Sequence, residues 1–279
     1  MSNYAAEILA LGPDAYWRLG EASGVAAINA ANPGTYDGVY TPNAGGVWTK
    51  GTLGQPGPLV NDATSRSAYF NGPTYPSSFD DLGGGQVTVG NVLNPENDSY
   101  SVVAWFRRAN LSLHQSGRYI AAKGAVANPN VWAIGINTSG SNGLLQVWCS
   151  NGDVSNAASM RLDVKPPHYI LDTDWHMVAM SIDRDANSLF AWLDGDDSVF
   201  EIYSGYNSDL SNLGYASTPY PITIGCTGYN GGLRYFNGDI AEVSIFKGRA
   251  LTGAEIQRLY RCANFNAAWA AGSNQLIGV

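Results

Sequence analysis

The chain has 279 residues, of which 45% are hydrophobic, so it can bury a sizeable core. Only 14% of the residues are charged and the net charge is −8, with no run of Lys or Arg, which disfavours nucleic acid and anionic membrane as partners. No segment approaches the ~20 apolar residues of a membrane-spanning helix, and the N-terminus lacks the pattern of a secretion signal. We therefore expect a soluble protein that is not exported by such a signal.

Taken in chain order, the sequence predicts a short helix from Tyr4 to Leu11, which Gly12 and Pro13 stop. Residues 20–67 and 203–220 are rich in Gly, Asn, Ser and Tyr and are predicted to be long surface loops. The clearest predicted strands cover residues 99–108, 118–123, 131–137, 144–150, 175–183, 188–194, 221–226 and 239–246. About twelve strands with little helical periodicity predict one large all-β sandwich.

The predicted strand 175–183 is apolar on both faces, which carry Trp175, Met177 and Ala179 on one side and Val178, Met180 and Ile182 on the other. Such a strand is covered on both sides, as in a sandwich with loops or further strands packed outside.

A second helix is predicted over residues 253–261. Thr252 and Glu255 have the spacing of a capping box, and an apolar stripe follows it. The stripe consists of Leu251, Ile256 and Leu259.

The three cysteines, Cys149, Cys226 and Cys262, lie far apart in the chain and have no metal-binding spacing. We expect buried free thiols, with a Cys149–Cys226 disulfide between neighbouring strands as the alternative.

Four blocks in order resemble the laminin-G-like branch of the concanavalin A-like lectin/glucanase superfamily. They are Ala15–Gly24 (AYWRLGEASG), Ala68–Gly72 (AYFNG), Asp174–Val178 (DWHMV) with Leu193–Gly195 (LDG), and Asn237–Val243 (NGDIAEV) leading to Arg249–Ile256. The resemblance implies a jelly-roll β-sandwich of two antiparallel sheets with a short C-terminal helix, in which the first and last strands are adjacent. It divides the chain into an N-terminal segment (1–14), the jelly-roll domain (15–261) and an apolar C-terminal tail (262–279).

Several residues of these blocks have evident structural roles. Trp17 and Trp175 suit the space between the sheets, and Asn71-Gly72 and Asp194-Gly195 are turn dipeptides whose Gly accepts a positive φ. His176 is expected to be a packed, hydrogen-bonded histidine, with a catalytic or metal-binding role as the alternative.

The sequence predicts no enzyme and no catalytic residues. Hydrolases of the superfamily resemble one another in a strand with E-x-D-x-x-E, which supplies the paired carboxylates of glycoside hydrolysis, and this chain has no such motif. A nucleophile elbow and a phosphate-binding loop are also missing, and His114, His168 and His176 lie in unrelated contexts.

We expect no cofactor, with a structural calcium ion as the alternative. Residues 183–187 and 194–197 are acidic but are explained by turn chemistry. Relatives often hold a structural Ca²⁺ beneath the closing strand, commonly with an acidic residue where this chain has Ala241. Oxygen ligands could still come from Glu242 and from the loop Asn32 to Asp37.

Sugar binding is the commonest activity that the resemblance implies, and it uses aromatic faces beside polar side chains. The candidate ligand-binding residues are Trp48, Tyr75, Tyr206, Tyr215 and Tyr229, from a wider set that adds Tyr36, Tyr40, Tyr203 and Tyr220. The alternative, which we favour at this stage, is that these loops pack on one another or on partner subunits, where Tyr is also enriched.

The opening residues from Tyr4 to Gly20 resemble the start of many phage tail and head-surface proteins that carry this domain. We therefore expect a virion protein, a tail or fibre component or a capsid decoration, that forms homo-oligomers, contacts other virion proteins and could recognise host-surface glycans. A free carbohydrate-binding lectin module is the alternative, and a glycan-active enzyme is the third.

The tail from Cys262 to Val279 contains Phe265, Trp269 and Leu276 but no charged residue. It is too short to build a core of its own, so we expect it to dock on a neighbouring subunit, with packing over its own sheet as the alternative.

Overall fold

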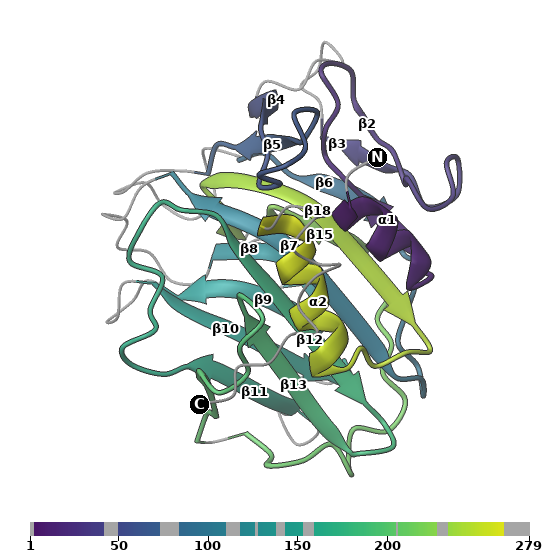
Figure 1. Ribbon diagram of the computed structural model, residues 1–279. Helices are drawn as coiled ribbons and strands as arrows, with labels where there is room; N and C mark the ends of the chain where they lie inside the picture. The colour runs from purple at the N-terminus through teal and green to yellow at the C-terminus, as the bar shows by residue number, and fades with distance from the viewer. Residues whose placement is uncertain are drawn as a thin grey trace, which may run out of the picture.

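The computed structural model describes residues 3–41, 50–72, 84–109, 118–125, 128–137, 143–152, 159–204, 206–227 and 234–264. Two large antiparallel sheets face each other in a jelly-roll sandwich, so the predicted fold class is confirmed (Figure 1). The seven-stranded sheet has the order β13 (Ser188–Leu193), β12 (His176–Asp183), β7 (Tyr100–Arg108), β18 (Gly238–Lys247), β5 (Arg66–Phe70) and β4 (Gly51–Pro56), with β1 (Ala15–Trp17) paired to β18.

The second sheet has nine strands and is the larger layer of the sandwich. Its order is β14 (Phe200–Ile202), β11 (Ser159–Val164), β10 (Leu144–Ser150), β9 (Asn128–Asn137), β8 (Arg118–Ala125), β15 (Ile222–Ile224), β6 (Val87–Gly90), β3 (Gly38–Tyr40) and β2 (Ala26–Ala27). A separate two-stranded ribbon, β16 (Cys226–Thr227) and β17 (Arg234–Tyr235), contacts β8.

Strands β1 and β18 are adjacent and antiparallel, with Trp17 opposite Val243, which confirms the expected pairing of the first and last strands. Trp17 is fully buried between the sheets, and its indole Nε1 donates to the backbone oxygen of Tyr36 at 2.9 Å. Alternate residues of the strands fill this core because successive side chains of a strand point to opposite faces. Val178 and Met180 of β12 belong to this core, as does Leu145 of β10 in the other sheet.

The other face of the seven-stranded sheet is covered by two helices, where the sequence favoured loops or further strands. Helices α1 (Asn3–Ala10) and α2 (Gly253–Asn264) lie across it in Figure 1. Met177 and Ala179 pack there with the helices in a second apolar cluster, so β12 is covered on both faces as predicted. The predicted stripe is buried in this cluster, with Ile256 and Leu259 on α2 and Leu251 just before it. Thr252 and Glu255 exchange the hydrogen bonds of a capping box.

Helix α2 runs three residues beyond its predicted end at Arg261, to Asn264. Ala263 is 1% exposed, and its carbonyl oxygen accepts a hydrogen bond from the Val60 amide at 3.3 Å. The first residues assigned to the tail, Cys262 to Asn264, are therefore part of this helix, and the remainder of the tail lies outside the described residues. Within the described residues, neither helix has the length and apolar character needed to cross a membrane.

Trp175 does not lie between the sheets, so this prediction is wrong. The residue comes just before β12, is only partly buried, and packs on the helix-covered cluster. The guanidinium carbon of Arg107 lies 5.2 Å from the centroid of its ring. Two tryptophans are buried on this face, Trp192 on β13 and Trp105 on β7, and Trp105 packs edge-on against Tyr4 and stacks on Tyr260.

The segment 20–67 is not a plain loop, contrary to prediction. Its residues form β2 and β3, which extend the nine-stranded sheet, and β4, which pairs with β5. Short strands rich in Gly and Ala carry too little hydrophobic periodicity for sequence analysis to find them. In the segment 203–220, by contrast, the described residues form no strand, although Leu210, Leu213 and Ala216 are buried.

The two turn dipeptides require glycine for different reasons. Asp194 and Gly195 have φ values of 55° and 84°, as predicted for a hairpin turn. Gly72 has no positive φ; a Cβ at this position would lie 2.4 Å from the backbone oxygen of Phe236, so close approach of the two segments requires glycine there. Residues 184–187 form the turn between β12 and β13, where Asp183 accepts the amides of Asp185 and Ala186.

Candidate functional site

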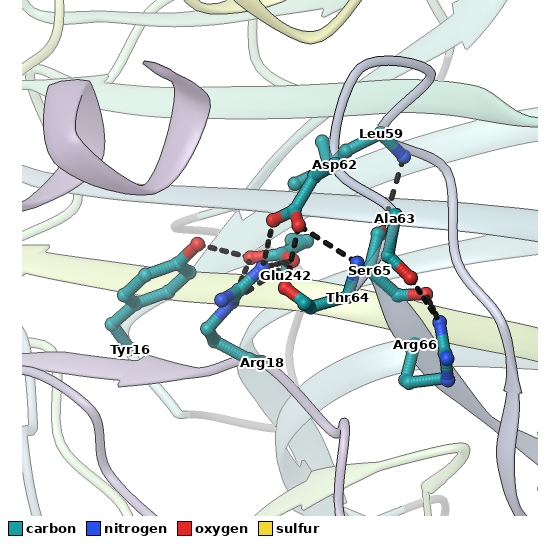
Figure 2. A network of polar contacts seen from close by, with 9 residues as sticks. All are labelled: Tyr16, Arg18, Leu59, Asp62, Ala63, Thr64, Ser65, Arg66 and Glu242. Carbon is teal, nitrogen blue, oxygen red and sulfur yellow. Dashed lines mark hydrogen bonds and ion pairs between the residues drawn. The ribbon is translucent and has the colours of Figure 1, made fainter. Parts of the chain in front are cut away.

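Two polar regions are candidates for a functional site within the part of the chain that the structure describes. The first surrounds Glu242 on the closing strand β18, which bulges where it pairs with β7. Glu242 has a φ of 54° and is fully buried. Figure 2 shows the carboxylate held between Tyr16, whose hydroxyl donates to it, and Arg18, whose Nη2 donates at 2.9 Å. The Arg18 Nη2 also donates to Asp62 at 3.2 Å.

The charged groups of this network pair with one another, although burial outweighs the hydrogen bonds from Arg18 and Tyr16 at Glu242 and raises the pKa of that carboxyl. Burial works against the charge of Arg18, but its hydrogen bonds to Glu242 outweigh that effect and raise the pKa of the guanidinium. Partial burial similarly opposes the charge of Asp62, whereas hydrogen bonds from Thr64 and Arg18 lower its pKa to about 2. Tyr16 and Arg18 belong to the AYWRLGE block, so this block ties the first strand to the last.

The alternative of a structural calcium ion does not fit these residues. Arg18 supplies a positive group at the carboxylate of Glu242, and Ala241 packs in the apolar cluster beneath the helices. In the loop Asn32 to Asp37, the carboxylate of Asp37 accepts the amides of Asn29 and Gly34 and shapes the loop itself. The described residues contain no group of three or more His, Cys, Asp and Glu side chains that could hold a metal.

A shallow cleft of about 300 Å³ opens beside the Glu242 network. Its charged side chains are already engaged: Arg18 in the network, Glu21 with the Tyr40 hydroxyl, and Arg66 with the backbone oxygens of Ala63 and Ser65. The cleft is lined by Arg18, Gly20, Glu21, Ile28, Ala30, Thr64 and Arg66. The polar side chains of this region therefore have a structural role, because they join the first strand to the last strand of the sandwich.

His176 is similarly engaged, in a cluster with Asp172 and Asp194. Its Nδ1 lies 2.7 Å from Asp194 and its Nε2 lies 2.9 Å from Asp172. Burial disfavours the imidazolium, but the two carboxylates, Asp194 first, raise the pKa of His176 to about 9. The expected hydrogen-bonded histidine is confirmed.

The second polar region lies on the outer face of the nine-stranded sheet. Strand β10 turns Leu145, Val147 and Cys149 into the core, so Gln146 and Trp148 point outward. In β11 the core residues are Met160, Leu162 and Val164, which leaves Arg161 and Asp163 on the outer face. The register puts Trp148 opposite Arg161 and Gln146 opposite Asp163.

Arg161 is the centre of this region. Its Nε and Nη2 donate to the two carboxylate oxygens of Asp163, both at 2.6 Å, and Gln146 donates to the same oxygens at 3.2 Å. The guanidinium carbon lies 3.9 Å from the ring centroid of Tyr203 and 5.8 Å from that of Tyr206. Burial works against the charge of Arg161, but the bonds to Asp163 and to the Tyr206 side chain raise its pKa.

The aromatic rings around Arg161 differ in exposure. Tyr203 is 42% exposed, Tyr206 and Trp148 are partly buried, and Tyr119 is 7% exposed where the β16–β17 ribbon contacts β8. Tyr203 and Tyr206 meet edge-on at 5.9 Å, and Tyr119 and Trp148 do so at 5.2 Å. Strand β9 lies between Tyr119 on β8 and Trp148 on β10, and there it carries the small residues Ala133 and Gly135. We call Trp148, Arg161, Asp163, Glu201, Tyr203 and Tyr206 the outer-face site.

The structure brings only part of the predicted aromatic set into the outer-face site. Tyr206 and Tyr203 lie in it. Tyr215 belongs to a different cluster, in which its hydroxyl donates to Glu96 at 3.2 Å. Tyr40 is fully buried. Three predicted residues, Trp48, Tyr75 and Tyr229, lie outside the described residues.

Sequence analysis missed Trp148, Arg161 and Asp163. The signal was present as a period of two: every second residue of LLQVWCS and SMRLDV is apolar and faces the core, and the residues between them face outward. The three cysteines are free, and burial raises the pKa of the Cys149 thiol to about 12.

A family model described as the concanavalin A-like lectin/glucanases superfamily matches residues 81–257 of this chain. No curated protein matches it. Among solved structures, domain 4 of AbnA, a GH43 extracellular arabinanase from Geobacillus stearothermophilus, in complex with arabinotriose, is 16% identical, with a TM-score of 0.52 over 89% of this chain and 98% of that domain.

Two neurotoxin structures are similar to the chain at the same level. The binding domain of botulinum neurotoxin DC in complex with rat synaptotagmin II is 14% identical, with a TM-score of 0.55 over 92% of this chain and 53% of that one. Botulinum neurotoxin type C, whose cell entry is dependent upon interaction with two ganglioside molecules, is 13% identical, with a TM-score of 0.55 over 94% of this chain and 53% of that one. This chain therefore spans about half the length of those two. Identities this low establish a shared fold.

Proposed function

Since the chain belongs to the concanavalin A-like lectin/glucanase superfamily, we propose that it is a non-enzymatic glycan-binding protein of a bacteriophage particle surface. The fold alone does not assign a function, because the same sandwich serves many. The observation that carries the proposal is the outer-face site, where the exposed ring of Tyr203 and the partly buried rings of Tyr206 and Trp148 lie beside a fixed pair of charged side chains.

The outer-face site has the chemistry that sugar binding needs. The apolar face of a sugar ring packs on an aromatic ring, and its hydroxyls pair with nearby polar groups. Tyr203 supplies an exposed ring, while Arg161 holds the opposite face of that ring by stacking. A ring that is already fixed loses little conformational entropy when a ligand binds.

The similar structures support a binding role on this fold without fixing the ligand. Their descriptions name an arabinotriose, gangliosides and a protein. For this chain the mixture of aromatic and polar groups at the outer-face site favours the glycan over a protein partner.

The non-enzymatic part of the proposal rests on the state of the carboxylates. Retaining glycoside hydrolysis needs two carboxylates ~5–5.5 Å apart, one of them a free nucleophile. The register puts Asp163 opposite Glu201 on the outer face, but Arg161 and Gln146 already occupy the Asp163 oxygens. Hydrolysis of a bound polysaccharide that disappeared in Glu201→Gln would overturn this part.

The virion part rests on the resemblance of Tyr4–Gly20 to the start of phage tail and head-surface proteins. In such a particle the chain would be a tail, fibre or decoration subunit that is made in the host cytoplasm, forms homo-oligomers and contacts other virion proteins. Mass spectrometry of purified particles tests this directly. Presence of the chain in the particles supports the proposal, whereas its absence favours the alternative of a free lectin module.

Glycan binding is tested with an array and with matched variants. We expect the protein to bind a defined set of glycans, and Tyr203→Ala and Tyr206→Ala to lose at least about tenfold in affinity. Phe190→Ala is the control, since Phe190 is an aromatic of similar exposure (39%) on β13 of the other sheet. Equal binding by all variants would mean that the outer-face site is not used.

A further inference from the structure

The charged groups of the outer-face site are one cation, Arg161, and two carboxylates, Asp163 and Glu201. Arg161 and Asp163 form a two-bond ion pair, with side chains 17% and 7% exposed. Glu201 is exposed and lies opposite Asp163 on the same face, because directly paired residues of an antiparallel ladder share a face. The part of the site nearest the exposed Tyr203 ring therefore carries one more negative charge than positive charge.

Two further cations of the described residues, Lys165 and Arg234, lie farther from Tyr203. Lys165 follows β11 four residues after Arg161, whose backbone pairs with Tyr203, so at ~3.3 Å per residue it lies about 13 Å along the strand. Arg234 belongs to β17, which contacts β8, whereas Glu201 belongs to β14. The row Tyr119, Gly135, Gln146, Asp163 and Glu201 crosses four strand spacings. At ~4.8 Å per spacing, Tyr119 and Glu201 are about 19 Å apart. A single sugar ring on Tyr203 does not reach that far.

The guanidinium of Arg161 is not open to an acidic ligand either. Two of its nitrogens are committed to Asp163, one face is stacked on Tyr203, and the Tyr206 side chain bonds to it. An acidic ligand would have to compete with Asp163 for these donors, and the displaced Asp163 carboxylate would remain nearly buried without its partner.

We infer, on the basis of the proposed function, that the outer-face site binds neutral glycans and rejects glycans with a sialic acid, uronic acid or sulfate on the sugar that contacts Tyr203. Glu201 supplies a carboxylate that accepts hydroxyl hydrogen bonds from a neutral sugar and repels an anion. Selection of this kind works by a built-in repulsive group as well as by attractive contacts.

The experiment compares matched pairs of glycans that share a core and differ only in one acidic group. We expect the neutral member of each pair to bind at least about tenfold more tightly than its acidic counterpart. Affinity for the neutral member should also be nearly independent of salt, because no net charge is paired on binding.

Two variants change the charge of the site while keeping its shape. Asp163→Asn leaves Arg161 without its carboxylate, and Glu201→Gln removes the repelling charge. Each is expected to reduce the preference for the neutral member several-fold, with Asp163→Asn the stronger of the two. Thermal melting verifies that both variants fold, and Glu201→Gln, at an exposed position, keeps the test valid if Asp163→Asn is unstable.

Three outcomes separate this inference from the proposed function. Preference for neutral glycans that Tyr203→Ala abolishes supports both. Preference for acidic glycans that Tyr203→Ala abolishes retains the proposed function and overturns the inference. Absence of binding, or binding that Tyr203→Ala leaves unchanged, overturns the proposed function, and the inference fails with it.

Discussion

The outer faces of the two sheets follow the same alternation but carry opposite kinds of residue. On the seven-stranded sheet the outward positions include Trp105 and Met177, which lie beneath the two helices. On the nine-stranded sheet they include Trp148, Arg161 and Asp163, and the exposed Tyr203 stacks on Arg161. One outward face thus serves stability and the other presents polar and aromatic groups at the surface.

The comparison shows that the role of a tryptophan on an outer face depends on the residues around it. Trp105 is 1% exposed between Tyr4 and Tyr260, whereas Trp148 is partly buried against Tyr119 and faces Arg161 across the strands. Substitutions at matched positions of the two faces should therefore separate stability from binding.

The largest effect is expected for Trp105→Ala, which should lower the free energy of unfolding by ~3–5 kcal/mol because it empties the space beneath the helices. Trp148→Ala should cost about 1–2 kcal/mol and weaken glycan binding instead. Chemical denaturation measures both. Equal costs for the two tryptophans would contradict the distinction between the faces.

The next largest effect on stability concerns Arg18 and Arg161, the two arginines that pair with buried carboxylates. Arg18→Met leaves the buried carboxylate of Glu242 without a cation and should cost ~2–4 kcal/mol. Arg161→Met should cost less, about 1–2 kcal/mol, since Gln146 still donates to Asp163. Adding Glu242→Gln to Arg18→Met should recover part of the loss. A calcium chelator should leave the melting temperature of the unmodified protein unchanged; a large drop would restore the calcium alternative.

A smaller effect depends on pH and belongs to the seven-stranded sheet. Because the pKa of His176 is raised to about 9, from an ordinary value of 6.5, its contribution to stability is fully present below pH 6.5 and is lost as the pH rises to about 9. We expect a decrease of about 1–2 kcal/mol over this interval, which His176→Asn should remove. Glycan affinity should stay constant, since the raised pKa of Arg161 keeps that site charged. Parallel loss of affinity and stability would contradict this separation.

The smallest effect on stability is expected from truncation after Asn264, the last residue of α2. We propose that the removed residues serve assembly, so the melting temperature should change little while self-association or incorporation into particles weakens. Truncation after Arg261 is the informative companion, because it also removes the buried Ala263 and should lower the melting temperature. A large drop in melting temperature after truncation at Asn264 would show that the tail belongs to the core of the domain.

Much of the fold could be predicted because its signals are local. The strand 144–150 is found at its predicted bounds, and the capping box at Thr252 forms as expected. The pairing of the first and last strands is a long-range feature, and it became predictable only through the resemblance of whole sequence blocks.

The outer-face site could not be predicted as a unit. Its members come from β10, β11, β14 and the segment after β14, and only the register between these strands brings Trp148, Arg161 and Tyr203 together. Trp175 shows a different limit of the sequence. A periodicity of two groups it correctly with Met177 and Ala179, which lie in the same cluster, but it cannot say which face of the strand meets the other sheet.

Strand β18 lies in the interior of its sheet, between β7 and β5, and it supplies Glu242 to Tyr16, a partner 226 residues earlier in the chain. During synthesis, β5 and β7 emerge well before the strand that joins them, and each has an unpaired edge until residues 238–247 leave the ribosome. Contacts of such sequence separation make folding slow, and they delay closure of the sandwich until nearly all the described residues exist. The nascent chain should therefore be at its greatest risk of aggregation just before β18 is synthesised. Chaperones that shield strand edges should act on it at that stage.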